Sequence, residues 1–158
     1  MVDFSFRDPL DLHVLAELRE ASGTTDIDDS AQTESTAFPI LTIAPVSGLA
    51  LYDVEVHLDL AKATTGFAAV ETTVTVQFGI ERKVDGTNWR REAYVEAALS
   101  GTNAASRMAK INVGSIGAVE QARIVALFSA DVTADMEIPY RVLYRSLAAP
   151  TITAVAAG

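Results

Sequence analysis

The sequence predicts a mainly β protein: an antiparallel β-sandwich of jelly-roll type with about seven or eight strands. Three observations support this fold class. Apolar and polar residues alternate with a period of two in several stretches after Phe38. Gly, Pro, Asn and Asp residues mark turns between these stretches. The 158 residues include no cysteine, and that length suffices for one core without disulfides. A closed β-barrel is the alternative that the alternation leaves open.

The first segment, residues 1–36, is predicted to be an N-terminal arm with one short helix and an acidic linker. Asp8 is a suitable N-cap and Pro9 suits the first helical position, so we expect a helix over residues 9–21. Residues 23–36, "GTTDIDDSAQTEST", are polar and acidic and are expected to form a loop. Phe4 and Phe6 alternate with polar residues in "VDFSF", so they are candidates for docking on a sheet edge or a neighbouring molecule.

The β-sandwich body is predicted to span residues 37–148. In "YDVEVHLDL" the residues Val54, Val56, Leu58 and Leu60 alternate with polar ones, which indicates a strand with one buried face. The same pattern places Val76, Phe78 and Ile80 in the core. Further strands are expected at residues 39–44, 70–82, 88–99, 108–113, 122–130 and 136–147. Residues 149–158 form a tail of small residues without charge, which is expected to lie on its own surface or on a partner's.

The segment "ERKVDGTNWRREA", residues 81–93, is predicted to be a hairpin with two possible registers. A two-residue turn at Asp85-Gly86 sets Glu81 opposite Arg90 and is favoured. A four-residue loop over residues 85–88 improves the apolar matches but opposes like charges, and a bulge would change the parity altogether.

The hairpin also carries the strongest binding candidates of the body. Its tip holds Arg82, Lys83, Arg90 and Arg91, a positive spot that could meet an acidic partner or only protect a strand edge. Trp89 shares parity with the buried residues and is expected on the core side. If Trp89 and the tyrosines were displayed instead, they would suit a non-catalytic carbohydrate-binding or adhesion module, which is the alternative function.

Charge and composition exclude several other classes. The chain has 12 basic and 21 acidic residues and a formal net charge of −9, which disfavours nucleic acid and anionic membranes as partners. No secretory signal or membrane span is expected from its apolar runs. We expect no enzymatic activity, because no nucleophile motif or phosphate-binding loop is present, and outward glutamates are typical of any wet sheet face.

No metal or cofactor is expected either. His13 and His57 lie in different elements and lack the spacing of a metal centre, and "DIDDS" (residues 26–30) lacks the glycine and distal glutamate of a calcium loop. His57 is expected on the polar face of its strand.

The arm (Met1–Ser22), the hairpin "FGIERKVDGTNWRREA" and the segment "IPYRVLYRSLAA" together resemble the capsid decoration, or cement, proteins of tailed bacteriophages. The resemblance is one of layout over the whole chain. It implies a structural protein that forms homo-oligomers, with a trimer favoured, and binds the major capsid protein between capsid subunits, so that it stabilises the shell. It also implies a place on the capsid surface of the virion after synthesis in the host cytoplasm.

Overall fold

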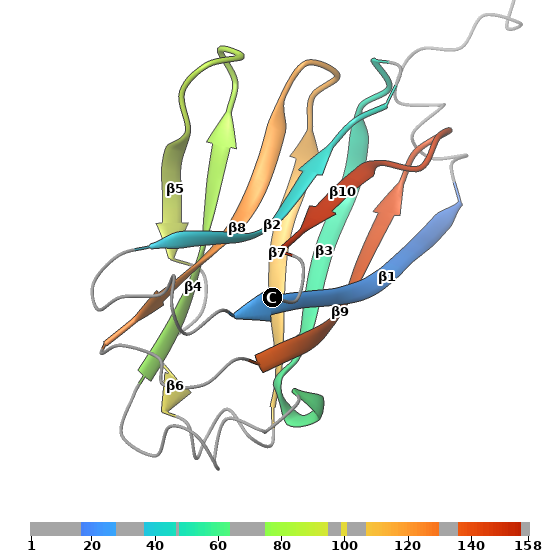
Figure 1. Cartoon of the computed structure of the whole chain (residues 1–158). Coiled ribbons are helices and arrows are strands. Elements are labelled where there is room, and N and C mark those ends of the chain that lie inside the picture. The colour runs from blue at the N-terminus through green and yellow to red at the C-terminus, as the bar shows by residue number, and fades with distance from the viewer. Residues whose placement is uncertain are drawn as a thin grey trace, which may run out of the picture.

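The computed structural model of the chain describes residues 17–27, 37–46, 48–63, 75–94, 99–100, 107–129 and 136–155. These residues form the strands β1 (Leu18–Ile27), β2 (Phe38–Ala44), β3 (Leu51–Asp59), β4 (Thr75–Lys83), β5 (Arg90–Tyr94), β6 (Leu99–Ser100), β7 (Met108–Ile116), β8 (Gln121–Phe128), β9 (Met136–Arg145) and β10 (Thr151–Ala154) (Figure 1). A short 3-10 turn, η1 (Leu60–Lys62), follows β3.

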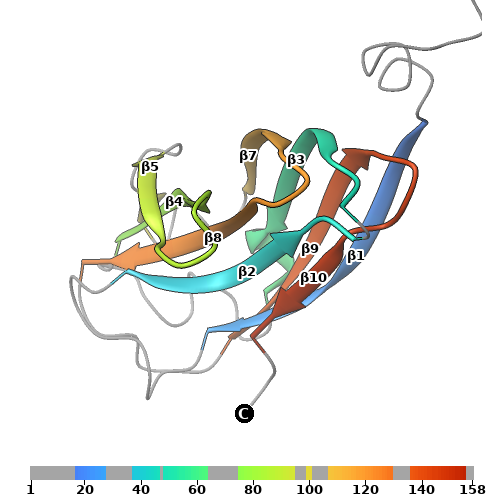
Figure 2. The same ribbon diagram turned by 90° about the horizontal axis from the view of Figure 1, so that it is seen from above.

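The strands form two antiparallel sheets that face each other around one core (Figure 2). Sheet A has the order β1-β9-β3-β7, and sheet B has the order β10-β2-β8-β4-β5, with β6 also paired to β4. The mainly β, antiparallel architecture is therefore confirmed. The described residues hold more strands than the seven or eight that were predicted, because β1, β6 and β10 also join the sheets.

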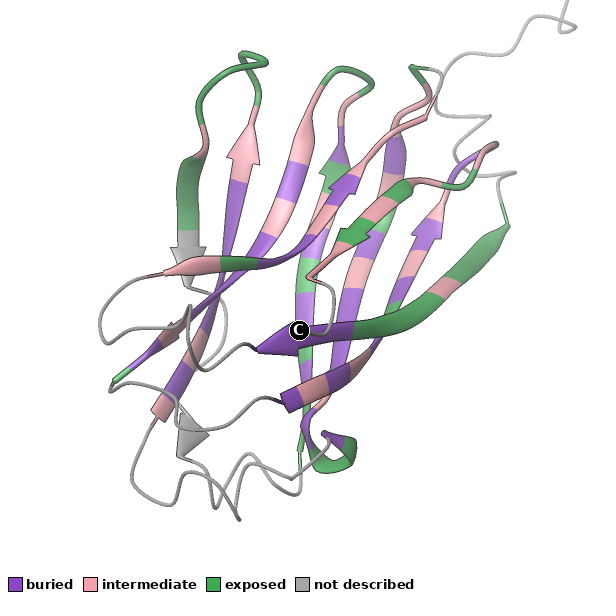
Figure 3. Ribbon diagram, in the orientation of Figure 1, coloured by how far each residue is buried: buried purple, intermediate pink, exposed green. Residues whose placement is uncertain are grey.

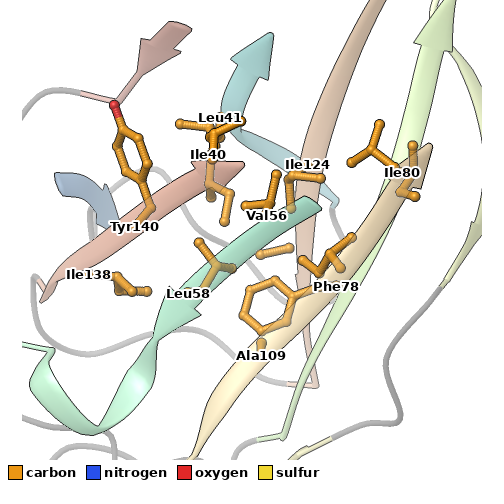
Figure 4. Packing of buried hydrophobic residues seen from close by; sticks show 14 of the residues in the cluster. Ile40, Leu41, Val56, Leu58, Phe78, Ile80, Ala109, Ile124, Ile138 and Tyr140 are labelled. Atoms are coloured by element: carbon orange, nitrogen blue, oxygen red, sulfur yellow. The ribbon is translucent and has the colours of Figure 1, made fainter. Parts of the chain in front are cut away.

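The alternating residues of the sequence supply the core, as predicted. Val54, Val56 and Leu58 of β3 are fully buried, and so is Phe78 of β4. Figure 3 shows the resulting purple bands along the strands, and Figure 4 shows side chains of both sheets meeting in the interior. Because the strands expose every other residue, one face of each sheet is buried and the opposite face carries most of the charged groups.

The predicted helix and loop near the N-terminus are wrong where the structure describes them. Residues 18–27 form β1, which pairs in unbroken register with β9 from Leu18–Arg145 to Ile27–Met136. Pairing with β9 outweighs the polar composition of this segment. The backbone of β9 takes up the hydrogen bonds of the β1 backbone, and the Tyr140 ring of β9 lies next to Gly23. The rest of the predicted helix and arm lies outside the described residues.

The end of the chain closes one side of the sandwich. Residues 151–154 of the predicted tail form β10, which pairs with β2 at the edge of sheet B. Just beyond it, the amide of Asp26 in sheet A donates to the carbonyl of Val155 at 3.1 Å, and the amide of Val155 donates to Ile40 of sheet B at 3.4 Å. This connection between the sheets, which we call the Val155 seam, means that the two-sheet body extends beyond the predicted limits of 37 and 148 at both ends.

Candidate functional site

The hairpin of β4 and β5 adopts neither of the two unbroken registers. Ile80 lies opposite Ala93, as in the four-residue loop, but Glu81 lies opposite Arg91 and Arg82 opposite Arg90. Glu92 is therefore an extra residue in β5, and the favoured two-residue register is wrong. The loop is held by Asp85, whose carboxylate accepts hydrogen bonds from the amides of Thr87 and Asn88 at 2.9 and 2.7 Å.

The bulge reverses the side on which Trp89 lies. Past Glu92 the parity of β5 changes, so Trp89 lies on the outer face of sheet B and not on the core side that was predicted. Its ring is covered by the guanidinium of Arg123 at 4.3 Å from the centroid, and the ammonium of Lys83 lies 5.1 Å from the centroid. The ring that a carbohydrate-binding site would display is thus in contact with a cation of its own chain.

The predicted basic tip is largely neutralised within the chain. Arg91 pairs with Glu81 at 2.9 Å, and Arg123 reaches the other oxygen of the same carboxylate at 2.6 Å. Glu81 is 8 % exposed, so two cations compensate one buried carboxylate. Arg90 at the tip is the most exposed of the four predicted basic residues that line the hairpin, and its nearest acidic atom is on Asp85 at 3.5 Å.

Arg82 points inward and fastens β4 to the edge of β7. Its Nη1 donates to the carbonyl of Ser115 at 2.7 Å, and its Nη2 donates to the carbonyl of Val113. Its Nε donates to Glu92 at 3.0 Å. The side chain that was predicted to bind a partner therefore covers the carbonyl groups of an edge strand in its own sandwich. We call this contact the Arg82 clamp.

A groove lies on the outer face of sheet A. Its volume is about 570 Å³. It crosses β1, β9 and β3, and its polar lining includes Glu20, Ser22, Thr24, His57, Asp59 and Arg141. Lys62 of η1 and Met108 of β7 lie at its far end. We call it the sheet A groove.

His57 lies in the floor of this groove within a chain of polar contacts. Its Nε2 contacts the carboxylate of Glu55, and its Nδ1 accepts from Arg141 at 3.1 Å. These partners fix the tautomer with the proton on Nε2. The hydrogen bond from His57, helped by Lys110 at 3.4 Å, holds the pKa of Glu55 below its usual value of 4.5 although burial opposes this shift. His57 is on the polar face, as predicted, but it is only 7 % exposed because its neighbours cover it.

Sequence reasoning did not find the sheet A groove. Glu20 was assigned to the predicted helix, Ser22 to the end of that helix and Thr24 to the linker, so their alignment with Arg141 was not visible before β1 was known to pair with β9. The signal that could have found it is Gly23, since a glycine in a strand often marks a close approach by another group. A Cβ atom at this position would lie 2.7 Å from the Tyr140 hydroxyl.

The groove and the hairpin do not offer a recognisable metal centre. Within the described ranges no group of three or more His, Asp or Glu side chains is arranged to hold a metal ion. Of the "DIDDS" carboxylates, Asp26 is buried in β1, whereas residues 28–30 lie outside the described residues, as do Phe4, Phe6 and His13.

In the part of the chain that the structure describes, no helix has the length and apolar character needed to cross a membrane. No protein-family model, no curated protein and no solved structure matches the chain.

Proposed function

We propose that the chain is a structural virion protein: a capsid decoration protein that binds the major capsid protein between subunits and stabilises the shell of a tailed bacteriophage. In this role it acts at the capsid surface as a homo-oligomer, after synthesis in the host cytoplasm, and it catalyses no reaction. The resemblance of the sequence motivates the proposal, and the strand order is the observation that supports it most.

The strand order fits a jelly roll, which we include in the proposal. In an eight-stranded jelly roll the first, last, third and sixth strands form one sheet, and the second, seventh, fourth and fifth form the other. With β6 taken as a continuation of β5 and β10 as an addition to the edge, the orders β1-β9-β3-β7 and β2-β8-β4-β5 follow this rule. Jelly rolls are frequent in viral capsid proteins and in lectins, so the support is an analogy at the level of the fold.

The position of β1 gives a second, independent support. β1 is the edge strand of sheet A (Figure 1). Its residues Glu20, Ser22 and Thr24 line the sheet A groove. The edge of β1 is therefore at the periphery of the body, where we propose that a neighbouring capsid subunit binds.

The contacts of Trp89 do not favour the carbohydrate-binding alternative. A stacking platform needs a bare aromatic face, and the Trp89 ring carries the Arg123 guanidinium at 4.3 Å. The capsid proposal needs no such face.

Cosedimentation with shells assembled from the major capsid protein tests the proposal. We expect the full chain to sediment with expanded, mature shells and to raise their melting temperature, and we expect a variant without residues 1–16 to bind less. Unexpanded shells are the matched control, because their subunit junctions differ while the protein content is the same. If the purified chain stays in the supernatant with every virion component, the proposal is refuted.

A further inference from the structure

The outer edge of β1 presents backbone groups that no described residue uses. The Asp26 amide points away from β9, since it donates to Val155. Residues at even spacing in an antiparallel strand direct their N–H and C=O groups to the same side. Because β1 pairs with β9 without a register shift, the backbone groups of Leu18, Glu20, Ser22 and Thr24 also face outward.

This edge is also accessible. Every residue from 18 to 24 except Ala21 is exposed, and none of them pairs in the described part of the chain with a strand other than β9. The edge spans about 20 Å, which is the length of an ordinary strand. It ends at Asp26, where the Val155 seam occupies the next outward amide.

We propose that this edge is a dimer interface, at which β1 pairs antiparallel with β1 of a second copy and joins the two A sheets across a two-fold axis. The inference rests on the proposed function in that it gives the homo-oligomer a geometry. The axis makes the basic unit a dimer, in place of the trimer that the resemblance implies.

The bounded edge selects one register. Since only residues 18–24 are open, the largest overlap places the axis at Ala21, with Leu18 opposite Thr24 and Glu20 opposite Ser22 of the other copy. This arrangement makes about eight backbone hydrogen bonds. On the inner face Ala21 lies at the axis, and Arg19 of each copy lies opposite Gly23 of the other, so no two bulky side chains oppose each other there.

Charges agree with this register. Ser22 is the neighbour of Arg141 in the pairing with β9, and Arg141 already lies 3.7 Å from Glu20 of its own chain. The second copy places its Glu20 opposite Ser22, so the two Glu20 carboxylates are diagonal neighbours across the axis and lie between the two Arg141 guanidiniums, which offset their repulsion. On the inner face Arg19 of the second copy lies opposite Gly23, so its charge meets no side chain of like charge.

A second copy of this chain is a suitable occupant of the edge, because two identical strands can pair antiparallel across a two-fold axis. An interface in which one strand meets its own copy is closed, so it yields a dimer and not an open fibre. The two sheet A grooves then lie side by side, because Glu20, Ser22 and Thr24 line both the groove and the edge.

Ser22→Pro tests the interface with little effect on the fold of one chain. Its amide faces the open edge and makes no bond to β9, so proline removes only a donor that the second copy would use. The matched control is Ala118→Pro, which lies in the turn closed by the Glu120 amide and the Gly117 carbonyl at 2.9 Å, at a position that accepts proline. Both variants are checked for the β-sheet circular dichroism spectrum and for cooperative melting.

Light scattering on the full chain in plain buffer, over a range of concentrations, gives the mass. We expect two chains for the wild type and for Ala118→Pro, and a dissociation constant raised at least about tenfold for Ser22→Pro. A wild-type monomer, a trimer, or a Ser22→Pro variant that dimerises as tightly as the wild type would each overturn the proposal. No capsid is present, so this result is separate from the cosedimentation test.

Amide hydrogen exchange of the wild type serves where the proline variant does not fold. The amides of Glu20, Ser22 and Thr24 are expected to be protected in the dimer and to exchange fast on dilution, whereas those of Ala21 and Gly23 stay protected by β9. If the first three amides are protected in a monomer, another segment of the same chain covers the edge and the dimer proposal is wrong.

Discussion

Replacing Arg82 by methionine is expected to lower the free energy of unfolding by about 2 kcal/mol. The guanidinium makes three hydrogen bonds, to the carbonyls of Val113 and Ser115 and to Glu92. Bonds of a charged donor contribute roughly 1.5–3 kcal/mol each when they are buried. This side chain is 19 % exposed and Glu92 is 52 % exposed, so water replaces part of what is lost and the ion pair itself contributes little. Methionine keeps the apolar stem, which confines the change to the polar head.

Urea unfolding followed by circular dichroism measures this loss, at one protein concentration for all variants. For a chain of 158 residues, about 2 kcal/mol corresponds to a fall in melting temperature of about 4–8 °C. The matched control is Arg90→Met, since Arg90 is 71 % exposed and 3.5 Å from Asp85. We expect that variant to lose less than about 0.5 kcal/mol.

A third variant separates charge from geometry. Arg82→Lys keeps the positive charge but cannot reach two carbonyls of β7 and a carboxylate at once, so it should recover less than half of the loss. If Arg82→Met and Arg90→Met lose equal stability, the Arg82 clamp does not hold β4 to β7 and the reasoning fails.

Three further substitutions test the two sheets. Gly23→Ala should destabilise the protein by about 1–3 kcal/mol in urea unfolding, because the new Cβ would lie 2.7 Å from the Tyr140 hydroxyl. The same substitution made in a Tyr140→Leu variant should cost less stability, since the hydroxyl is then absent. If Gly23→Ala costs nothing in either protein, β1 moves freely relative to β9. The lowered pKa of Glu55 stabilises the fold above the unfolded pKa near 4.5, and this contribution disappears as the pH falls through the folded pKa. Because the hydrogen bond from His57 is the main cause of the lowering, His57→Leu should raise the pKa of Glu55 in a carboxyl NMR titration. An unchanged pKa would contradict this cause. Phe78→Ala should cost about 3–5 kcal/mol, since the ring is fully buried, and a loss below about 1 kcal/mol would mean that the core is not packed as described.

The central strands could be predicted from the sequence because their alternation matches their burial. β3 and β8 were expected within two residues of their observed ends, and the predicted inward residues of β3 and β4 that the structure describes are all buried. In these strands the local pattern and the tertiary packing favour the same conformation.

The edge strands could not be predicted, since their conformation depends on a neighbour. β1 reads as "LREASGTTDI", with helix-forming residues at its start and polar ones after them, and its exposed residues carry no alternation. Only the pairing with β9, more than a hundred positions later in the chain, makes it a strand. β10 likewise depends on β2.

The hairpin shows how one residue changes a prediction about a site. The sequence correctly identified two paired strands and a turn at Gly86, whose φ is +75°. It could not show the extra residue at Glu92, and the parity of every residue from there to the turn depends on that bulge. For this reason Trp89 was expected on the wrong face. The inward reach of Arg82 to β7 was missed for another reason: Arg82 shares the parity of Phe78 and Ile80 in β4, but its charge near the turn was taken to mean exposure.

The Val155 seam has a consequence for the order in which the protein can be completed during synthesis. β1 and β2 leave the ribosome early, yet β1 must wait for β9, and neither sheet edge at the seam is closed until residue 155 has emerged. Contacts over such sequence separations form slowly, because a long loop must be closed before they contribute. The nascent chain therefore exposes the unpaired edge of β2 until β10 has been made, and β10 then closes that edge, whereas the edge of β1 stays open.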